Sequence, residues 1–273
     1  MPRLSGGAPR PLLAAALLAC GVAAWAHDSW LQPAQAQPGS GLVALELGNG
    51  ARYPRSEGTT PAPRLAQSGC SAEGGDDKPL QPRGEQPAWL ELRSRIGAAR
   101  AVACWVELKP QEIALTPALA QAYLDDIRAP DAVRAAWSGR QRAGGGWREV
   151  YRKFVRIELP APQGREVVDL AALRRPRAFA LELVPAGGRP LRAGEESEFL
   201  VLSGGRPAAG LPVEFVSRRS PLGIWRTSDA EGRVRLVLPF GGEWLLRTTV
   251  IDVPAAESEP WHSRYASLTV AVR

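Results

Sequence analysis

The residues best suited to chemistry are two histidines, and one of them, His27, directly follows the triplet Ala24-Trp25-Ala26. Small residues at this spacing are typical of the site where a secretory leader is cut. Cleavage there would give His27 a free amino group, which could chelate a metal ion together with the imidazole. Both nitrogens lose protons near neutral pH, and nitrogen-rich sites favour copper(II) or nickel(II). The sequence therefore predicts metal ligation by His27. The alternative is that His27 only begins a strand.

The second histidine, His262, lies in the run WHSRY near the other end of the chain. If strands from both ends of the chain meet, His262 could supply a third nitrogen, as in the histidine brace of copper oxidative enzymes. The alternative is an ordinary histidine in a surface loop.

No other motif indicates catalysis. The sequence has no GxSxG, phosphate-loop, dinucleotide-binding or HExxH pattern. Two adjacent acid pairs, Asp76-Asp77 and Asp125-Asp126, are interpreted as surface residues. A conventional hydrolase or transferase is not indicated, and a non-enzymatic binding protein is expected.

The first 26 residues have the features of a signal peptide. Two arginines in the first ten residues precede the apolar run PLLAAALLACGVAA. This run is shorter than the roughly 18–20 residues of a membrane-spanning helix, so we expect an exported, periplasmic chain without an integral membrane span. The alternative is a lipoprotein anchored at Cys20, because LLACG resembles a lipidation motif.

Two cysteines, Cys70 and Cys104, remain after the leader. In an oxidising compartment an even pair of this kind indicates one disulfide. The alternative is a two-thiolate metal site, although no CxxC spacing supports it.

Charge and composition narrow the class of protein further. The net charge of +6 comes from scattered basic residues rather than a clustered stripe, so nucleic acid is not an expected partner. The chain contains 28 glycines and 25 prolines, which favour many short elements joined by turns.

The pattern of apolar residues predicts a mainly β protein with two domains. The first, 27–160, is a sandwich-like β domain with strands at 43–48, 89–94 and 101–108, a loop at 50–87 and a helical insertion at about 116–154. The insertion begins at Thr116-Pro117, an N-cap followed by proline, and its last part rests on the helical spacing of Trp147, Val150, Tyr151 and Phe154.

A linker at 161–176 is expected to lead into a second domain, 177–273. Seven short strand-like runs separated by turn signals predict an immunoglobulin-like sandwich. In the turn at 228–232, Gly232 is suited to a positive φ.

Eight tryptophans remain after the leader. An exposed row of them could bind carbohydrate, but most alternate with polar residues in predicted strands, which indicates core packing.

Three stretches carry a family resemblance: HDSWLQP at 27–33, RTSDAEGRVRL at 226–236 with GEWL at 242–245, and WHSRYASLT at 261–269. On these stretches the chain resembles the exported proteins of domain-of-unknown-function family 4198, which are related to the M component of nickel transporters. The resemblance implies a periplasmic β-sandwich that handles nickel or cobalt. Of the candidate site residues it supports His27 and Asp28. It differs at His262, where family members often carry an acid.

Together these observations predict a periplasmic, non-enzymatic protein that binds nickel, cobalt or copper for uptake or delivery, with a membrane metal transporter as the expected partner. The alternatives are a carbohydrate- or protein-binding β-sandwich without a metal and a histidine-brace copper enzyme.

Overall fold

The computed structural model describes residues 28–34, 41–72, 76–97, 101–159 and 169–273. This part of the chain is mainly β, as the sequence predicts, with several sheets, two α-helices and the short 3-10 helix η1 (Ala62–Arg64). Among the described residues, no helix has the length and apolar character needed to cross a membrane.

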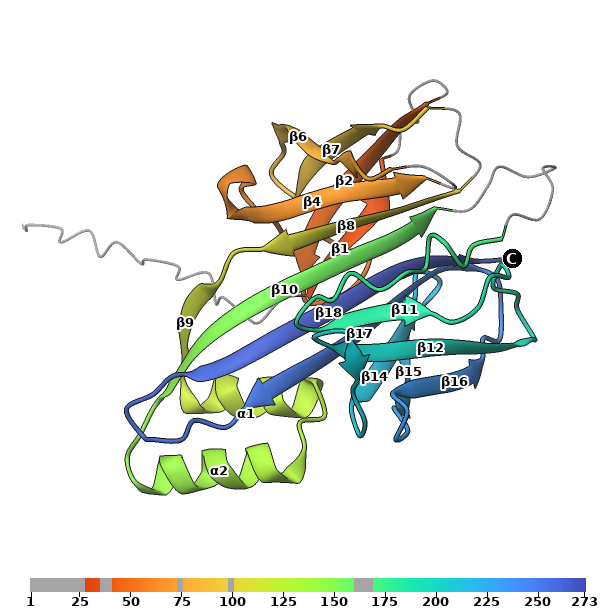
Figure 1. The fold of residues 1–273 in the computed structure, drawn as a ribbon. Helices are drawn as coiled ribbons and strands as arrows, with labels where there is room; N and C mark the ends of the chain where they lie inside the picture. Colours follow the sequence, from red (N-terminus) through yellow and green to blue (C-terminus); the bar gives the residue numbers. More distant parts are fainter. Residues whose placement is uncertain (1–27, 35–40, 73–75, 98–100, 160–168) are drawn as a thin grey trace, which may run out of the picture.

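A nine-stranded sheet forms the centre of the molecule (Figure 1). Its strands, in spatial order, are β15 (Ser220–Thr227), β14 (Pro212–Ser217), β17 (Gly242–Asp252), β18 (Trp261–Val272), β10 (Trp147–Leu159), β8 (Val102–Leu108), β4 (Leu65–Ala72) and β5 (Lys78–Pro79), with β9 (Gln111–Leu115) beside β10. Successive side chains in β10 enter different cores, with Phe154 on one face and Val155 and Ile157 on the other. The middle of the central sheet is therefore buried on both faces, whereas its edge strands β15 and β5 are largely exposed.

A smaller sheet covers one face near the N-terminal end of the chain. It consists of β1 (Asp28–Pro33), β2 (Leu42–Gly50), β7 (Trp89–Arg95) and β6 (Gln81–Glu85), with β3 (Gly58–Thr59) paired to β2. Apolar residues of this sheet, among them Leu31, Leu47 and Leu90, pack against Val106 and Ile157 of the central sheet.

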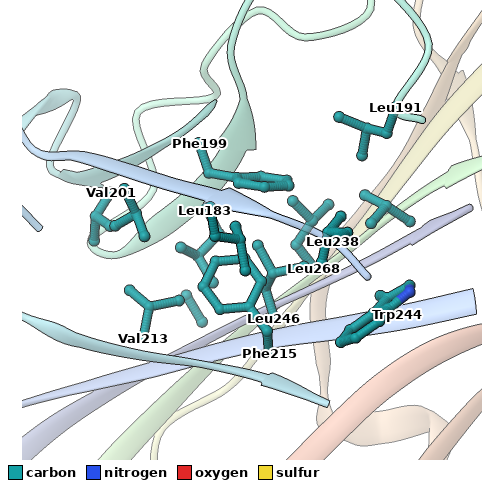
Figure 2. Packing of buried hydrophobic residues seen from close by; sticks show 14 of the residues in the cluster. Leu183, Leu191, Phe199, Val201, Val213, Phe215, Leu238, Trp244, Leu246 and Leu268 are labelled. Atoms are coloured by element: carbon teal, nitrogen blue, oxygen red, sulfur yellow. The ribbon is translucent and has the colours of Figure 1, made fainter. Parts of the chain in front are cut away.

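The opposite face is covered by a third sheet, made of β11 (Glu182–Pro185), β12 (Glu196–Ser203), β13 (Arg206–Pro207) and β16 (Arg233–Val237). Figure 2 shows the core between this sheet and the central one, where Phe199 and Phe215 meet with ring centroids 5.5 Å apart. All seven strand-like runs predicted after residue 177 form strands, and they enclose one shared core as in a β-sandwich.

The central sheet crosses the boundary that the sequence suggests between two domains. β18, from the last part of the chain, pairs in parallel with β10 from Glu149↔Trp261 to Ile157↔Thr269. The described part of the predicted linker, 169–176, also packs onto the fold, because Leu173 is buried with Ala103. The two halves are therefore joined by continuous backbone hydrogen bonding.

Two predictions about local structure are wrong. The stretch 50–87 is not one loop, since β3, β4, β5 and β6 lie within it. The segment 147–154, read as helical, begins the strand β10. A strand buried on both faces carries apolar residues in both registers, so its spacing resembles that of a helix.

The predicted helical insertion is correct over its first two thirds. α1 (Pro117–Asp126) begins at Thr116, whose Oγ1 accepts a hydrogen bond of 3.3 Å from the amide of Leu119. α2 (Asp131–Arg142) follows, and both helices pack beside β10 and β18.

Most tryptophans pack in the core, as predicted. Trp147 and Trp261 stack with ring centroids 4.4 Å apart, and Trp137 meets Trp147 edge-on at 5.3 Å. Trp30, Trp105 and Trp244 are also buried, whereas Trp89 and Trp225 are half-buried.

The predicted disulfide is confirmed. Cys70 of β4 and Cys104 of β8 are directly opposite partners in the central sheet, and their sulfur atoms are bonded. Both side chains are fully buried in the core beneath β2 and β7.

Candidate functional site

Of the predicted site residues, His27 lies outside the described part of the chain. Asp28 is the first residue of β1, and its side chain retains 14% of its exposure. Ser267 and Thr269 of β18 donate hydrogen bonds of 2.6 and 2.8 Å to the carbonyls of Ser29 and Leu31. The start of β1 is thus fixed against the middle of the central sheet.

Asp28 belongs to a group of charged residues that we call the Arg247 cluster: Arg247, Asp28, Glu214 and Asp126. The guanidinium of Arg247, on β17, donates to the carboxylates of Asp28 and Glu214. It also lies 3.3 Å from the carboxylate of Asp126, at the end of α1. One largely buried cation, whose side chain keeps 17% of its exposure, therefore connects β1, β14, β17 and α1.

Burial and charge act in opposite directions on this cluster. Burial raises the pKa values of Asp28 and Glu214, and the neighbouring Arg247 only partly offsets this effect. Burial alone would lower the pKa of Arg247, but the three carboxylates more than reverse this and raise it. Arg247 therefore stays charged, and it is the main compensation for burying Asp28 and Glu214.

Lys153, on β10, is a second buried cation close to the start of β1. Its Nζ donates hydrogen bonds of 3.3 Å to Ser29 Oγ and to Asn49 Oδ1. Burial lowers the pKa of Lys153 to about 8, and the nearby Asp28 carboxylate opposes the shift. The amine can therefore gain or lose a proton in a mildly alkaline range.

We expect this buried amine to make stability depend on pH. Because the folded-state pKa of about 8 lies below the ordinary 10.5, the ammonium form destabilises the fold, and this cost disappears as the pH rises. The free energy of unfolding should gain about 2 kcal/mol from Lys153 between pH 7 and 9.5. Urea titrations across this range should show that gain in the free energy of unfolding for the wild type and not for Lys153→Met. Parallel curves would contradict the prediction.

Glu149 is a buried carboxylate on the same strand as Lys153. It accepts a hydrogen bond of 2.7 Å from Trp147 Nε1, one of 3.2 Å from the hydroxyl of Tyr265, and another from Ser263 Oγ. Tyr123 of α1 completes the set at 3.4 Å. Burial raises the pKa of Glu149 even though these donors favour its ionised form. All four partners fix the carboxylate within the fold, so we interpret Glu149 as a residue that joins α1 to the sheet.

His262 does not meet the start of β1. It pairs in register with Val150 and Asp252 and is exposed. Ser267 and Thr269 point toward β1, so strand alternation directs His262 to the opposite face of β18. It also lies five residues from Ser267, about 17 Å along the strand at 3.3 Å per residue.

The acids and cations around Asp28 form a polar site. Within the described ranges, no three His, Cys, Asp or Glu side chains are grouped so that they could hold a metal ion. Asp28 and Glu214 are instead bound to Arg247.

Sequence reasoning found Asp28 but missed Arg247, Lys153, Glu214 and Glu149. One signal was present, since Lys153 is one of only three lysines in the chain and lies in the largely apolar run KFVRI. Arg247 gave no signal, because its contact to Asp28 joins residues 219 positions apart.

These observations define a mainly β protein in which two sheets cover a central sheet and the partly buried Arg247 cluster fixes the start of β1. A family model described as "Domain of unknown function (DUF4198)" matches residues 24–252, which is most of the chain. The chain belongs to this family. The match covers the first two quoted stretches, 27–33 and 226–236 with 242–245, and ends before the third, 261–269. No curated protein matches it.

Proposed function

We propose that the chain is an exported, periplasmic, non-enzymatic protein that binds a transition metal ion at an amino terminus formed by cleavage before His27. The α-amino nitrogen and the imidazole of His27 would be the principal ligands, with Asp28 as a neighbouring carboxylate. Nickel, cobalt and copper are the candidate metals, and delivery to a membrane transporter is the proposed role.

The observation that carries this proposal is the fixation of Asp28 by Arg247. A residue bonded to Asp28 has its Cα within about 3.8 Å of that of Asp28. A terminus at residue 27 would therefore begin beside an ordered, charged group and would lose less conformational freedom on binding than a trailing end. The three carboxylates of the Arg247 cluster outnumber the two nearby cations, Arg247 and Lys153, by one, so the formal charge of this region is negative and favours a further cation.

The nitrogen donors of the proposed site suit these metals, whereas the pairing of Asp28 limits the part that its carboxylate can play. Two nitrogens and a carboxylate suit copper(II) or nickel(II). The carboxylate of Asp28 is already paired with Arg247, so it would contribute mainly through its charge. Neither alternative function gains a supporting observation, because six tryptophans are buried and His262 lies on the other face of β18.

The test compares the chain beginning at His27 with a form that retains Ala26. Retention turns the amine of residue 27 into an amide and leaves its imidazole unchanged. Calorimetry with copper(II) or nickel(II) should show at least about tenfold tighter binding by the processed form, or 1.4 kcal/mol. Affinity should fall as the pH drops through about 8 and 6.5, since protons compete for both nitrogens.

A His262→Ala variant of the processed chain is the matched control and should bind as tightly as the wild type. Equal affinity of the processed and extended forms would contradict the amino-terminal chelate. Loss of binding in His262→Ala would favour a different ligand set. N-terminal sequencing of the exported protein provides a separate check, because a terminus at Cys20 would remove the proposed chelate.

A further inference from the structure

We infer that a basic cavity at the N-terminal sheet binds a compact multivalent oxyanion of the phosphate type. The cavity has a volume of about 420 Å³. Four basic side chains line it: Lys78, Arg83, Arg93 and Arg95. This site is independent of the function proposed above and lies on other elements.

Three short elements bring these cations together. Arg93 and Arg95 alternate with the buried Leu92 and Ser94 on β7, so both face away from the core. Gln81 of β6 is the direct partner of Arg93, and Arg83 follows on β6. Lys78 comes from β5, which belongs to the central sheet. Figure 1 shows β6 and β7 at the end of the molecule away from the two helices.

The positive charge of the cavity is largely uncompensated. The described residues that line it include no acid, and Leu42, Pro79 and Gln81 complete the lining. Arg93 approaches Glu91 only at 3.9 Å, and Arg83 donates to Gln81 at 3.3 Å. The side chains of Lys78 and Arg95 form no hydrogen bond or ion pair with any described residue.

This arrangement favours one class of ligand. Four cations around one small volume repel each other, and a multivalent anion would relieve that repulsion. The planar guanidinium of arginine matches the oxygen pairs of a phosphate group, and lysine adds a point charge. A volume of this size suits a small molecule or a lipid headgroup rather than a folded partner.

The experiment uses the purified chain and inorganic pyrophosphate, titrated by calorimetry at constant ionic strength. The double variant Arg93→Gln, Arg95→Gln should bind at least about tenfold more weakly, because charge-assisted hydrogen bonds are lost. The control Arg192→Gln, Arg226→Gln removes the same charge from exposed positions elsewhere and should bind like the wild type. Circular dichroism checks that both variants fold.

A second arm separates the two sources of phosphate. Co-sedimentation with phosphatidylglycerol vesicles, against phosphatidylcholine vesicles, tests a lipid headgroup. Binding to pyrophosphate alone assigns the site to a soluble anion, and vesicle binding lost in Arg93→Gln, Arg95→Gln assigns it to a membrane lipid. Absence of both, or equal loss in the two double variants, would overturn the inference.

Discussion

Removing the Cys70–Cys104 disulfide should lower the free energy of unfolding by about 3–4 kcal/mol. The bond joins residues 34 positions apart. On the chain-entropy model, a cross-link of this span lowers the conformational entropy of the unfolded chain and raises its free energy by that amount. Both sulfur atoms lie in a fully buried core, so replacing them with alanine adds a smaller packing loss.

Urea denaturation of the double variant Cys70→Ala, Cys104→Ala against the oxidised wild type measures this effect. Reductant should shift the wild type toward the variant and leave the variant unchanged. A reduced wild type with two titratable thiols and unaltered stability would show that the disulfide does not stabilise the fold.

The features that the sequence predicted correctly depend on neighbouring residues. Thr116 caps α1 through its own side chain, which requires only the amide three residues later. Gly232 adopts a φ of +70°, as the turn chemistry indicated. In the strands after residue 177, side chains alternate between one core and the solvent or a neighbouring sheet. This alternation can be read from neighbouring residues in the sequence.

The features that were missed depend on residues far apart in the chain. β4 carries the polar, small run LAQSGCSA, and nothing within it indicates a strand. Its glycine has a tertiary reason, because a Cβ on Gly69 would lie 2.6 Å from the Trp105 ring. Arg177 also stacks over the Trp105 ring, with its guanidinium carbon 3.5 Å from the ring centroid.

The candidate site shows the same division. Asp28 could be found because it follows the predicted cleavage site and matches the family pattern. Its partner Arg247 could not, since arginines are frequent in this chain and only the pairing of β17 with β18 brings one beside β1. The structure thus adds the residues that fix Asp28, and these are the ones with the largest expected effect on stability.

Replacing Arg247 with methionine should lower the free energy of unfolding by about 3–5 kcal/mol at neutral pH. The substitution leaves the largely buried carboxylates of Asp28 and Glu214 without their cation, and removing one partner of such a pair is strongly destabilising. The matched control is Arg218→Met, which removes a surface pair with Glu243 and should cost about 1 kcal/mol or less.

The loss in the free energy of unfolding caused by Arg247→Met should also depend on pH, because the carboxyls of the Arg247 cluster titrate. Burial raises the folded-state pKa values of Asp28 and Glu214, so ionisation of these carboxyls destabilises the fold as the pH rises through those values. Arg247 reduces that cost only while the carboxyls are ionised. The difference in the free energy of unfolding between wild type and variant should therefore be largest near pH 7 and shrink as both carboxyls become protonated in acid.

Urea titrations at pH 7, 6 and 5 test this. A triple variant that adds Asp28→Asn and Glu214→Gln to Arg247→Met should recover stability at pH 7. A deficit that stays constant with pH, and is not recovered in the triple variant, would mean that Arg247 acts through packing rather than through the charge of Asp28 and Glu214.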